Sequence, residues 1–255
     1  MGVAPVTSPF TDRSRLVSDA YADPSKLSAR HGIYRFRRDG ADFHDRLLDL
    51  VDWSGTDVLI DVGCGNAIYL ERLLRRLPAG ARVVGVDLSA GMLAAASHPT
   101  GRVVADVQQL PVASGCVDAV LALHMLYHVP DPKQAVRELR RVLRPGGVAV
   151  VSTNGPRHLT ELVELGDDRA LRGSRVLNMD AAEALLGEVF ARAERHDMLD
   201  VLEVTEAEPL VAYVRSTISL GGNAETAAAV EARIREIVAA GVFRLTVDAG
   251  VLLAR

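Results

Sequence analysis

The residues "LHMLYHVPD" at positions 123–131 carry two imidazoles and a phenol that could do chemistry. His124 and His128 stand four residues apart, a spacing that shares one face if the segment is helical, and Tyr127 lies beside the second histidine. Zinc needs three or four ligands and magnesium prefers carboxylate and water oxygens, so this segment predicts no metal site. We expect His124 and His128 either to accept a proton near neutral pH or to hold the loop by hydrogen bonds, and Tyr127 to face a substrate.

A second segment, "IDVGCGNAIYL" at 60–70, follows an apolar run and precedes an amphipathic one. Gly63 and Gly65 let the backbone turn tightly and approach a ligand where a Cβ would clash. The dinucleotide fingerprint needs a third glycine for close helix–strand packing, and Ile68 stands there instead. The loop therefore predicts a ligand-binding turn, with a dinucleotide as the weaker interpretation.

Two carboxylates follow the glycine loop. Asp87 ends the next apolar run, 22 residues after Gly65, at a spacing typical of a carboxylate that accepts hydrogen bonds from ribose hydroxyls. Asp106 is expected to end the third strand, where it could accept from an exocyclic adenine amine. Because the carboxyl ends of parallel strands meet at one edge of a sheet, the loop and both carboxylates predict one site for an adenosine-type ligand.

Alternating apolar runs and amphipathic segments must position these groups. The pattern predicts strands at 57–63, 82–87, 102–106, 117–124 and 148–154, and helices at 67–77, 89–98 and 132–143. Such alternation is typical of an α/β fold with a doubly wound, mostly parallel sheet and helices on both faces. Beyond it we expect helical material at 159–190, a strand at 193–204, and helices at 208–217 and 227–241. Residues 242–255 contain two β-rich runs around "DAG", which predicts a hairpin and antiparallel strands at the end of the sheet.

The composition is ordinary for a globular protein, with 49% hydrophobic and 24% charged residues in a chain of 255. The formal net charge of −4 argues against binding nucleic acid through its phosphates, which usually needs a basic surplus. Two cysteines indicate no disulfide scaffold and fit a reducing cytoplasm. The first residues lack a basic start followed by an apolar run, and no apolar run of about 18 residues occurs, so we expect neither a secretory signal nor a membrane span. We expect a cytoplasmic protein, monomeric or homodimeric, with no membrane and no nucleic-acid partner.

Four segments, "VLIDVGCGNAIYLERL", "VVGVDLSAGML", "ADVQQLP" and "VDAVLALHMLYHVPDPKQAVRELRRVLRPGGVAVVS", occur in this order over residues 57–153. Together they resemble the successive motifs of the class I S-adenosylmethionine-dependent methyltransferases, in their small-molecule branch. The resemblance implies a Rossmann-like sheet and S-adenosyl-L-methionine as cofactor. By position it also implies cofactor contacts from Asp61, Gly63, Cys64, Gly65, Asp87, Leu88, Met92, Asp106, Val107 and Leu123.

The histidine segment departs from one subgroup of that family. The subgroup carries a magnesium-binding E-x-x-E-H pattern at this location, and the corresponding positions here are His124, Tyr127 and His128. The resemblance therefore gives no reason to expect magnesium.

The family varies in its N-terminal segment and after the fifth strand, where it builds the acceptor pocket. We expect residues 1–52 to form a helical cap, and residues 53–255 to form the cofactor-binding domain with a helical insert at about 155–240.

Several residues of these variable segments are candidate contacts. We expect Tyr21 and Tyr34 at the methionine end of the cofactor and His31 at the acceptor. Arg172 and Arg175 are candidates for contact with an acidic acceptor, although solvated surface is the commoner place for such residues.

The resemblance implies direct displacement at a sulfonium methyl group, which needs in-line placement more than a dedicated catalytic group. A base is required only when the acceptor must lose a proton. No Asn/Asp-Pro-Pro-Tyr/Phe run follows the fourth strand, and neither Cys64 nor Cys116 is placed as a pyrimidine-methylating nucleophile. The expected reaction is methyl transfer to an oxygen or nitrogen of a small molecule, with secondary metabolism as a candidate setting. Two alternatives stay open: other chemistry with the same cofactor, such as decarboxylation or cyclisation, and a non-catalytic binding module.

Overall fold

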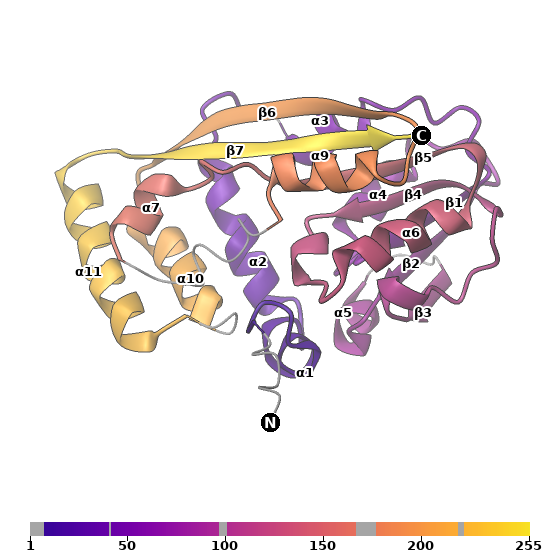
Figure 1. Ribbon diagram of the computed structural model, residues 1–255. Helices are drawn as coiled ribbons and strands as arrows, with labels where there is room; N and C mark the ends of the chain where they lie inside the picture. Colours follow the sequence, from indigo (N-terminus) through magenta and orange to yellow (C-terminus); the bar gives the residue numbers. More distant parts are fainter. Residues whose placement is uncertain (1–7, 41, 97–100, 167–176, 219–221) are drawn as a thin grey trace.

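One sheet organises the chain. The computed structural model describes residues 8–40, 42–96, 101–166, 177–218 and 222–255, and the strands among them form a seven-stranded sheet in the order β3-β2-β1-β4-β5-β7-β6 (Figure 1). The strands are β1 (Val58–Val62), β2 (Arg82–Asp87), β3 (Gly101–Val104), β4 (Val117–Leu123), β5 (Leu143–Asn154), β6 (Ala193–Val204) and β7 (Phe243–Ala254). The first five run parallel, whereas β7 pairs antiparallel with both β5 and β6. The predicted mostly parallel sheet with an antiparallel end is confirmed.

Helices cover both faces of this sheet. They are α1 (Arg13–Arg15), α2 (Ser25–Gly32), α3 (Phe43–Leu48), α4 (Ile68–Leu73), α5 (Ala90–Ala95), α6 (Pro132–Val142), α7 (Thr160–Glu164), α9 (Met179–Gly187), α10 (Ala207–Thr217) and α11 (Ala224–Ala240). On one face α6 and α9 bury Leu139 and Leu186 against the strands, and on the other α3 and α4 bury Leu47 and Leu70. Each such side chain stabilises the layers by about 1.5–3 kcal/mol, which holds the strand ends in register.

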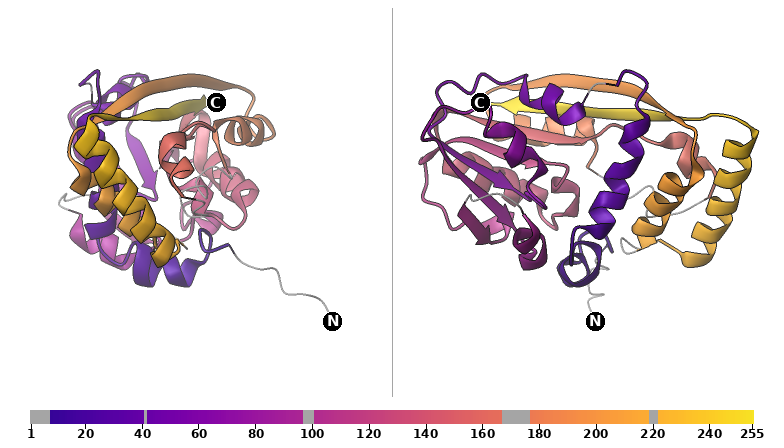
Figure 2. Two further views of the ribbon diagram at one scale, coloured as in Figure 1. Left: turned by 90° about the vertical axis from the view of Figure 1, so that its left-hand side faces the viewer. Right: turned by 180° about the vertical axis from the view of Figure 1, so that it is seen from behind.

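The β6–β7 pair extends beyond the parallel strands and carries a separate core. Only residues 249–254 of β7 pair with β5; the earlier part of the strand packs Leu245 against Leu210 of α10 and Ile234 of α11. Helix α2 stands between this extension and the parallel strands, beside α10 (Figure 2). The carboxyl ends of the parallel strands therefore face α2 and the segment that precedes it.

Three local predictions are wrong. Strand β3 ends at Val104, because the Asp106 carboxylate accepts the Gln108 N–H and begins a short helical turn. Strand β4 ends at Leu123, because His124 adopts a left-handed conformation with φ +52°.

The third error concerns the predicted hairpin, since residues 243–254 form one continuous strand. A Cβ on Gly250 would lie 2.6 Å from Cε of Met179 and 2.9 Å from the carbonyl oxygen of His196. The glycine in "DAG" therefore permits close packing inside a strand rather than a turn.

No helix among the described residues is long and apolar enough to cross a membrane. Arg172 and Arg175 lie outside the described residues. The division into a cap over 1–52 and a domain over 53–255 stays a prediction, although α3 packs on the sheet beside α4.

Candidate active site

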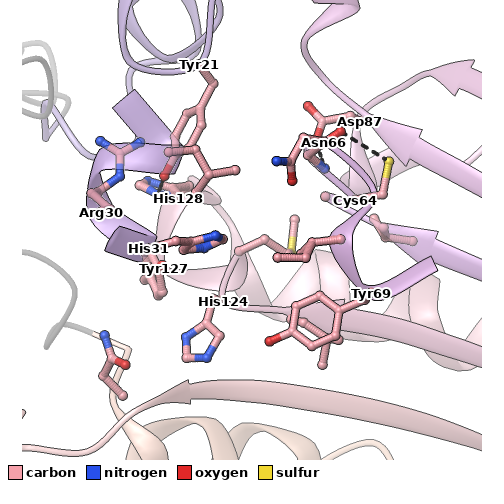
Figure 3. Close-up of a pocket in the computed structure, with 18 of the residues that line it drawn as sticks. Tyr21, Arg30, His31, Cys64, Asn66, Tyr69, Asp87, His124, Tyr127 and His128 are labelled. Atoms are coloured by element: carbon pink, nitrogen blue, oxygen red, sulfur yellow. Dashed lines mark hydrogen bonds between the residues drawn. The ribbon is translucent and has the colours of Figure 1, made fainter. Parts of the chain in front are cut away.

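A cavity of about 590 Å³ lies at the carboxyl ends of β1, β2 and β4 (Figure 3). Among the described residues, every residue that the sequence placed at the site lines this cavity except Met92. Met92 is fully buried, and its Cε would lie 3.4 Å from a Cβ on Gly65. Met92 therefore packs against the glycine loop from the protein core, on the side away from the cavity.

The glycine loop needs its glycines. Gly63 and Gly65 have φ +71° and +54°, and a Cβ on Gly63 would lie 2.7 Å from Cβ of Met125. Between them, Cys64 turns its sulfur toward the core, where it would lie 2.9 Å from a Cβ on Gly85. Burial raises the pKa of the Cys64 thiol, so Cys64 presents its backbone rather than a thiolate to a ligand.

Asp87 shapes the same loop. Its Oδ2 accepts the Gly65 N–H at 2.9 Å and its Oδ1 accepts the Ser89 N–H at 2.8 Å. Each carboxylate oxygen has a further lone pair, so the group can also accept from ribose hydroxyls. Ser89 caps α5 by accepting the Met92 N–H and donates its hydroxyl to the carbonyl of Tyr21, which ties the N-terminal segment to this edge.

Two polar atoms at the cavity are buried without a hydrogen-bond partner among the described residues, Oδ2 of Asp61 and Oδ1 of Asn66. Burial, together with the charge of Asp87, raises the pKa of Asp61 to about 8. An unpaired buried oxygen costs about 1–3 kcal/mol, and a cationic ligand with N–H donors would remove that cost. S-adenosylmethionine carries a sulfonium and an ammonium group, so these two residues and the glycine cradle fit it.

The next strand ends form the adenine side of the predicted site. Leu88 and Val107 line the cavity with Asp106, whose carboxylate forms an ion pair with Arg13 of α1. Leu123 ends β4 beside the glycine loop and is 6% exposed. The N-terminal segment thus reaches the position expected for the adenine.

Both ring nitrogens of His128 form hydrogen bonds. Nδ1 lies 2.9 Å from the carbonyl oxygen of Phe10 and must donate to it, so Nε2 accepts from the Tyr21 hydroxyl at 2.8 Å. Burial lowers the pKa of His128 to about 4, and the Phe10 ring stacks on the imidazole. This geometry favours the loop-holding interpretation over the proton acceptor for His128.

Tyr21 owes its place to an unusual helical turn. Residues Leu16–Ala20 form a π-helix, and the Tyr21 N–H donates to the Leu16 carbonyl at 2.8 Å. Turns of this kind are rare in proteins as a whole, but a large share of them occur at functional sites. The turn directs the phenol toward His128, and Arg30 lies over its ring with the guanidinium carbon 4.8 Å from the ring centre.

His124 lies at the floor of the cavity (Figure 3). Its ring Nε2 is 3.0 Å from the Ser152 hydroxyl, and its backbone N–H donates to the Ser152 carbonyl at 2.9 Å. Burial, together with the neighbouring His158, lowers the pKa of His124 to about 3. Its left-handed backbone costs about 1–3 kcal/mol, a strain that clusters at active sites. For His124, proton acceptance and support of the loop by hydrogen bonds both stay predictions.

The remaining predicted residues lie across the cavity from the glycine loop. The Tyr34 hydroxyl accepts from Nε2 of His158 at 3.1 Å, because Nδ1 of His158 accepts the Asp248 N–H. Burial lowers the pKa of His31 to about 4 and raises that of Tyr127 well above its ordinary value. Both side chains are therefore neutral at pH 7 and line the cavity as uncharged groups.

Several lining residues were missed from the sequence: Asn66, Asp42, His44, Tyr69, Asn154, His158 and Tyr213. Of these residues, only Asn66 could have been predicted from its position in the sequence, because it directly follows Gly65 in the glycine loop. Among the described residues, no group of three or more His, Cys, Asp or Glu side chains is arranged to hold a metal ion.

Known proteins resemble this chain in both sequence and fold. A family model described as "Methyltransferase domain" matches residues 60–151. The chain is 33% identical over 183 residues to malonyl-(acyl-carrier protein) O-methyltransferase of Pectobacterium atrosepticum, and the match covers 69% of each chain. It is 36% identical over 111 residues to an uncharacterised 37.1 kDa protein in transposon TN4556 of Streptomyces fradiae, covering 41% of this chain but only 32% of that protein's length.

A solved structure described as a methyltransferase from an antibiotic biosynthesis pathway of Anabaena variabilis shares the fold. It matches with a TM-score of 0.67 over 83% of this chain and 96% of that chain, at 17% identity. Such a likeness shows the fold, and a fold alone does not decide the reaction.

Proposed function

Because the chain belongs to the class I S-adenosylmethionine-dependent methyltransferases, with S-adenosylmethionine as methyl donor, we propose that it methylates an oxygen or nitrogen of a small molecule. One observation carries this proposal. The cavity runs without interruption from the glycine loop and Asp87 to a wall of neutral imidazoles and phenols. A donor and an acceptor can therefore meet inside one cavity.

We propose that the glycine loop, Asp61 and Asn66 hold the methionine part of the cofactor, and that Asp87 holds its ribose. When bound, S-adenosylmethionine supplies an electrophilic methyl group. The orphaned oxygens of Asp61 and Asn66 would accept hydrogen bonds from the ammonium group. Asp106 would accept from the adenine amine beside Leu88 and Val107.

The acceptor would lie between the glycine loop and α2. Tyr21, which His128 holds by a hydrogen bond, would cover the reacting centre from the N-terminal side. Tyr34, fixed by His158, and Tyr127 would limit the shape of the acceptor. Because displacement at a methyl group requires in-line placement, these rigid contacts would contribute mainly by orientation.

Calorimetry tests the cofactor and product analysis tests the reaction. Wild-type protein should bind S-adenosylhomocysteine, whereas Asp87→Ala should bind it at least 10-fold more weakly, because the carboxylate both contacts the ribose and supports the loop. Incubation with S-adenosylmethionine and separate sets of phenols, carboxylic acids and amines should release S-adenosylhomocysteine with at least one set, as measured by mass spectrometry.

Three other outcomes would contradict the proposal in different ways. Undetectable binding of S-adenosylhomocysteine and S-adenosylmethionine by folded protein would favour a binding module that no longer uses the cofactor. Conversion of a substrate without methyl transfer would favour decarboxylation or cyclisation. Cofactor binding without conversion of any tested small molecule would contradict the proposed acceptor class.

A further inference from the structure

One imidazole at the cavity is paired with a carboxylate. Nδ1 of His44 lies 3.0 Å from Oδ1 of Asp42, and His44 lines the cavity next to Tyr69, with ring centres 4.8 Å apart. Hydrogen bonds from Arg72 and His44 lower the pKa of Asp42 against the opposing effect of burial. Asp42 is therefore ionised at neutral pH and must accept the Nδ1 proton, which leaves Nε2 of neutral His44 as an acceptor.

The other cavity imidazoles are less suited to this role. Burial lowers the pKa of His31 to about 4, and among the described residues no carboxylate is paired with its ring. Both ring nitrogens of His128 and of His158 have partners, and Nε2 of His124 faces Ser152. Among the described residues, Nε2 of His44 has no hydrogen-bond partner, and the side chain is 18% exposed. A histidine whose Nδ1 is oriented by a carboxylate and whose Nε2 can accept a proton is an arrangement that suits general-base catalysis.

We propose that His44 is the general base of the proposed methyl transfer, that Asp42 is its positioning residue, and that the acceptor group is a phenolic hydroxyl. The proposal rests on the proposed function. In the step, the O–H bond breaks and the proton moves to Nε2 of His44. The oxygen keeps the electron pair and forms the bond to the methyl carbon, while the electrons of the S–CH3 bond stay on sulfur. The imidazolium is stabilised by Asp42 and later returns its proton to water.

The basicity of His44 selects the hydroxyl. Burial lowers the pKa of His44, and the Asp42 carboxylate raises it part of the way back, so the base is no stronger than an ordinary imidazole of pKa about 6.5. A phenol, with pKa about 10, lies within about four units of that value. An aliphatic alcohol, whose pKa is close to the 15.7 of water, lies about nine units away and is the harder group to deprotonate, so a weak base favours the phenol.

The rings around His44 fit a planar acceptor. Arg37 is paired with Asp200 at 3.5 Å, and its guanidinium carbon lies 5.0 Å from the ring centre of Phe43 and 5.2 Å from that of Tyr34. The aromatic side chains of Phe43, Tyr34 and Tyr69 offer flat surfaces for such an acceptor.

Nuclear magnetic resonance of the side chains tests the base apart from turnover. His44 should carry its proton on Nδ1, and Asp42→Asn should lower the pKa of His44 by more than it lowers that of His31. Asparagine keeps the cap of α3, where Asp42 accepts the N–H groups of His44 and Asp45, so the variant should fold. A His44 with its proton on Nε2, or a His44 pKa unchanged in Asp42→Asn, would overturn the proposal.

Phenol itself is the second probe, added to the complex with S-adenosylhomocysteine. Phenol should shift the Nε2 resonance of His44 saturably and more strongly than cyclohexanol, and His44→Gln should weaken phenol binding at least fivefold while the affinity for S-adenosylhomocysteine stays within twofold. Equal binding of phenol by wild type and His44→Gln would overturn the proposal that His44 is the base. The proposed methyltransferase function would be unaffected. Failure of the wild type to bind S-adenosylhomocysteine would instead overturn the proposed function.

Discussion

The two walls of the cavity are built in different ways. The wall that we assign to the cofactor comes from consecutive strand ends between Asp61 and Val107. The hydrogen bonds that Asp87 accepts there, from Gly65 and Ser89, join residues 22 and 2 positions apart. The facing wall comes from α2, α3, the turn after β4 and the segment after β5. Its contacts join residues far apart, such as Tyr21 and His128, which are 107 positions apart.

The chemistry of the walls differs as well. The cofactor wall holds carboxylates and unpaired acceptors, with the pKa of Asp61 raised by burial. The facing wall holds imidazoles whose pKa values burial lowers, among them His31, His124 and His128. One wall therefore suits a cation with many donors, and the other suits a neutral acceptor that must be oriented. Substitutions on the two walls should separate cofactor affinity from acceptor chemistry.

The largest effect is expected on the cofactor wall, from Gly63→Val. A side chain there would meet Met125 at 2.7 Å, in a backbone conformation with φ +71°. We expect the affinity for S-adenosylhomocysteine to fall more than 100-fold, as measured by calorimetry, because the loop must move away from the ligand.

Gly80→Val is the matched control. Gly80 has φ +88° and nothing within 4 Å of an added Cβ, so the variant bears the left-handed strain of about 1–2 kcal/mol without the collision. Its affinity should stay within twofold of wild type. Normal binding by Gly63→Val would show that the loop does not contact the cofactor.

A smaller effect, with opposite signs in two measurements, is expected from Asp61→Asn. The pKa of about 8 in the folded state exceeds the unfolded value of about 3.9, so this carboxyl lowers stability progressively as pH rises from about 4 to 8. Asparagine removes that cost, and Tm at pH 7.5 should rise. The affinity for S-adenosylmethionine should fall about 10-fold, because asparagine cannot ionise when the cation binds, whereas Asp61 can.

The exposed Asp57 at the start of β1 provides the comparison for this variant. Asp57→Asn should change neither Tm nor affinity appreciably. A lower Tm in Asp61→Asn, or an unchanged affinity, would contradict the assignment of a buried cation-binding carboxylate.

The smallest effect is expected on the facing wall, in the pH dependence of stability. His128 has a folded pKa of about 4 against about 6.5 when unfolded, so protonation of the unfolded chain destabilises the fold as pH falls through that window. Each such histidine contributes a slope of up to about 1.4 kcal/mol per pH unit. In urea unfolding, His128→Phe should show a slope between pH 6 and 5 that is shallower by about this amount than the wild-type slope. Equal slopes would mean that His128 is not buried in its neutral form.

The sequence placed the glycine loop and Asp87 at one edge of the sheet, because spacing along the chain sets this arrangement. Gly63, Gly65 and Asp87 follow β1 and β2, and parallel pairing brings these strand ends to one edge. The errors there were local: Asp106 begins a turn instead of ending β3, and Met92 supports the loop from below instead of lining the cavity. A hydrophobic pattern does not distinguish these arrangements.

For the histidines, the sequence could only name the alternatives. It placed His124 and His128 at the rim of the site, but their partners Ser152, Phe10 and Tyr21 come from other elements. His44 gave no signal, since its pairing with Asp42 resembles an ordinary helix cap until α3 packs beside α4 and Tyr69.

The sequence by itself determined the parallel sheet, its antiparallel end and the position of the glycine loop, because strand spacing and glycine conformation are local properties of the chain. Only the tertiary structure decided which imidazole is held on both nitrogens and which keeps one free. The physical reason is that the proton affinity and orientation of a buried histidine depend on burial and on partners, and folding brings those partners from distant segments to the same few ångströms.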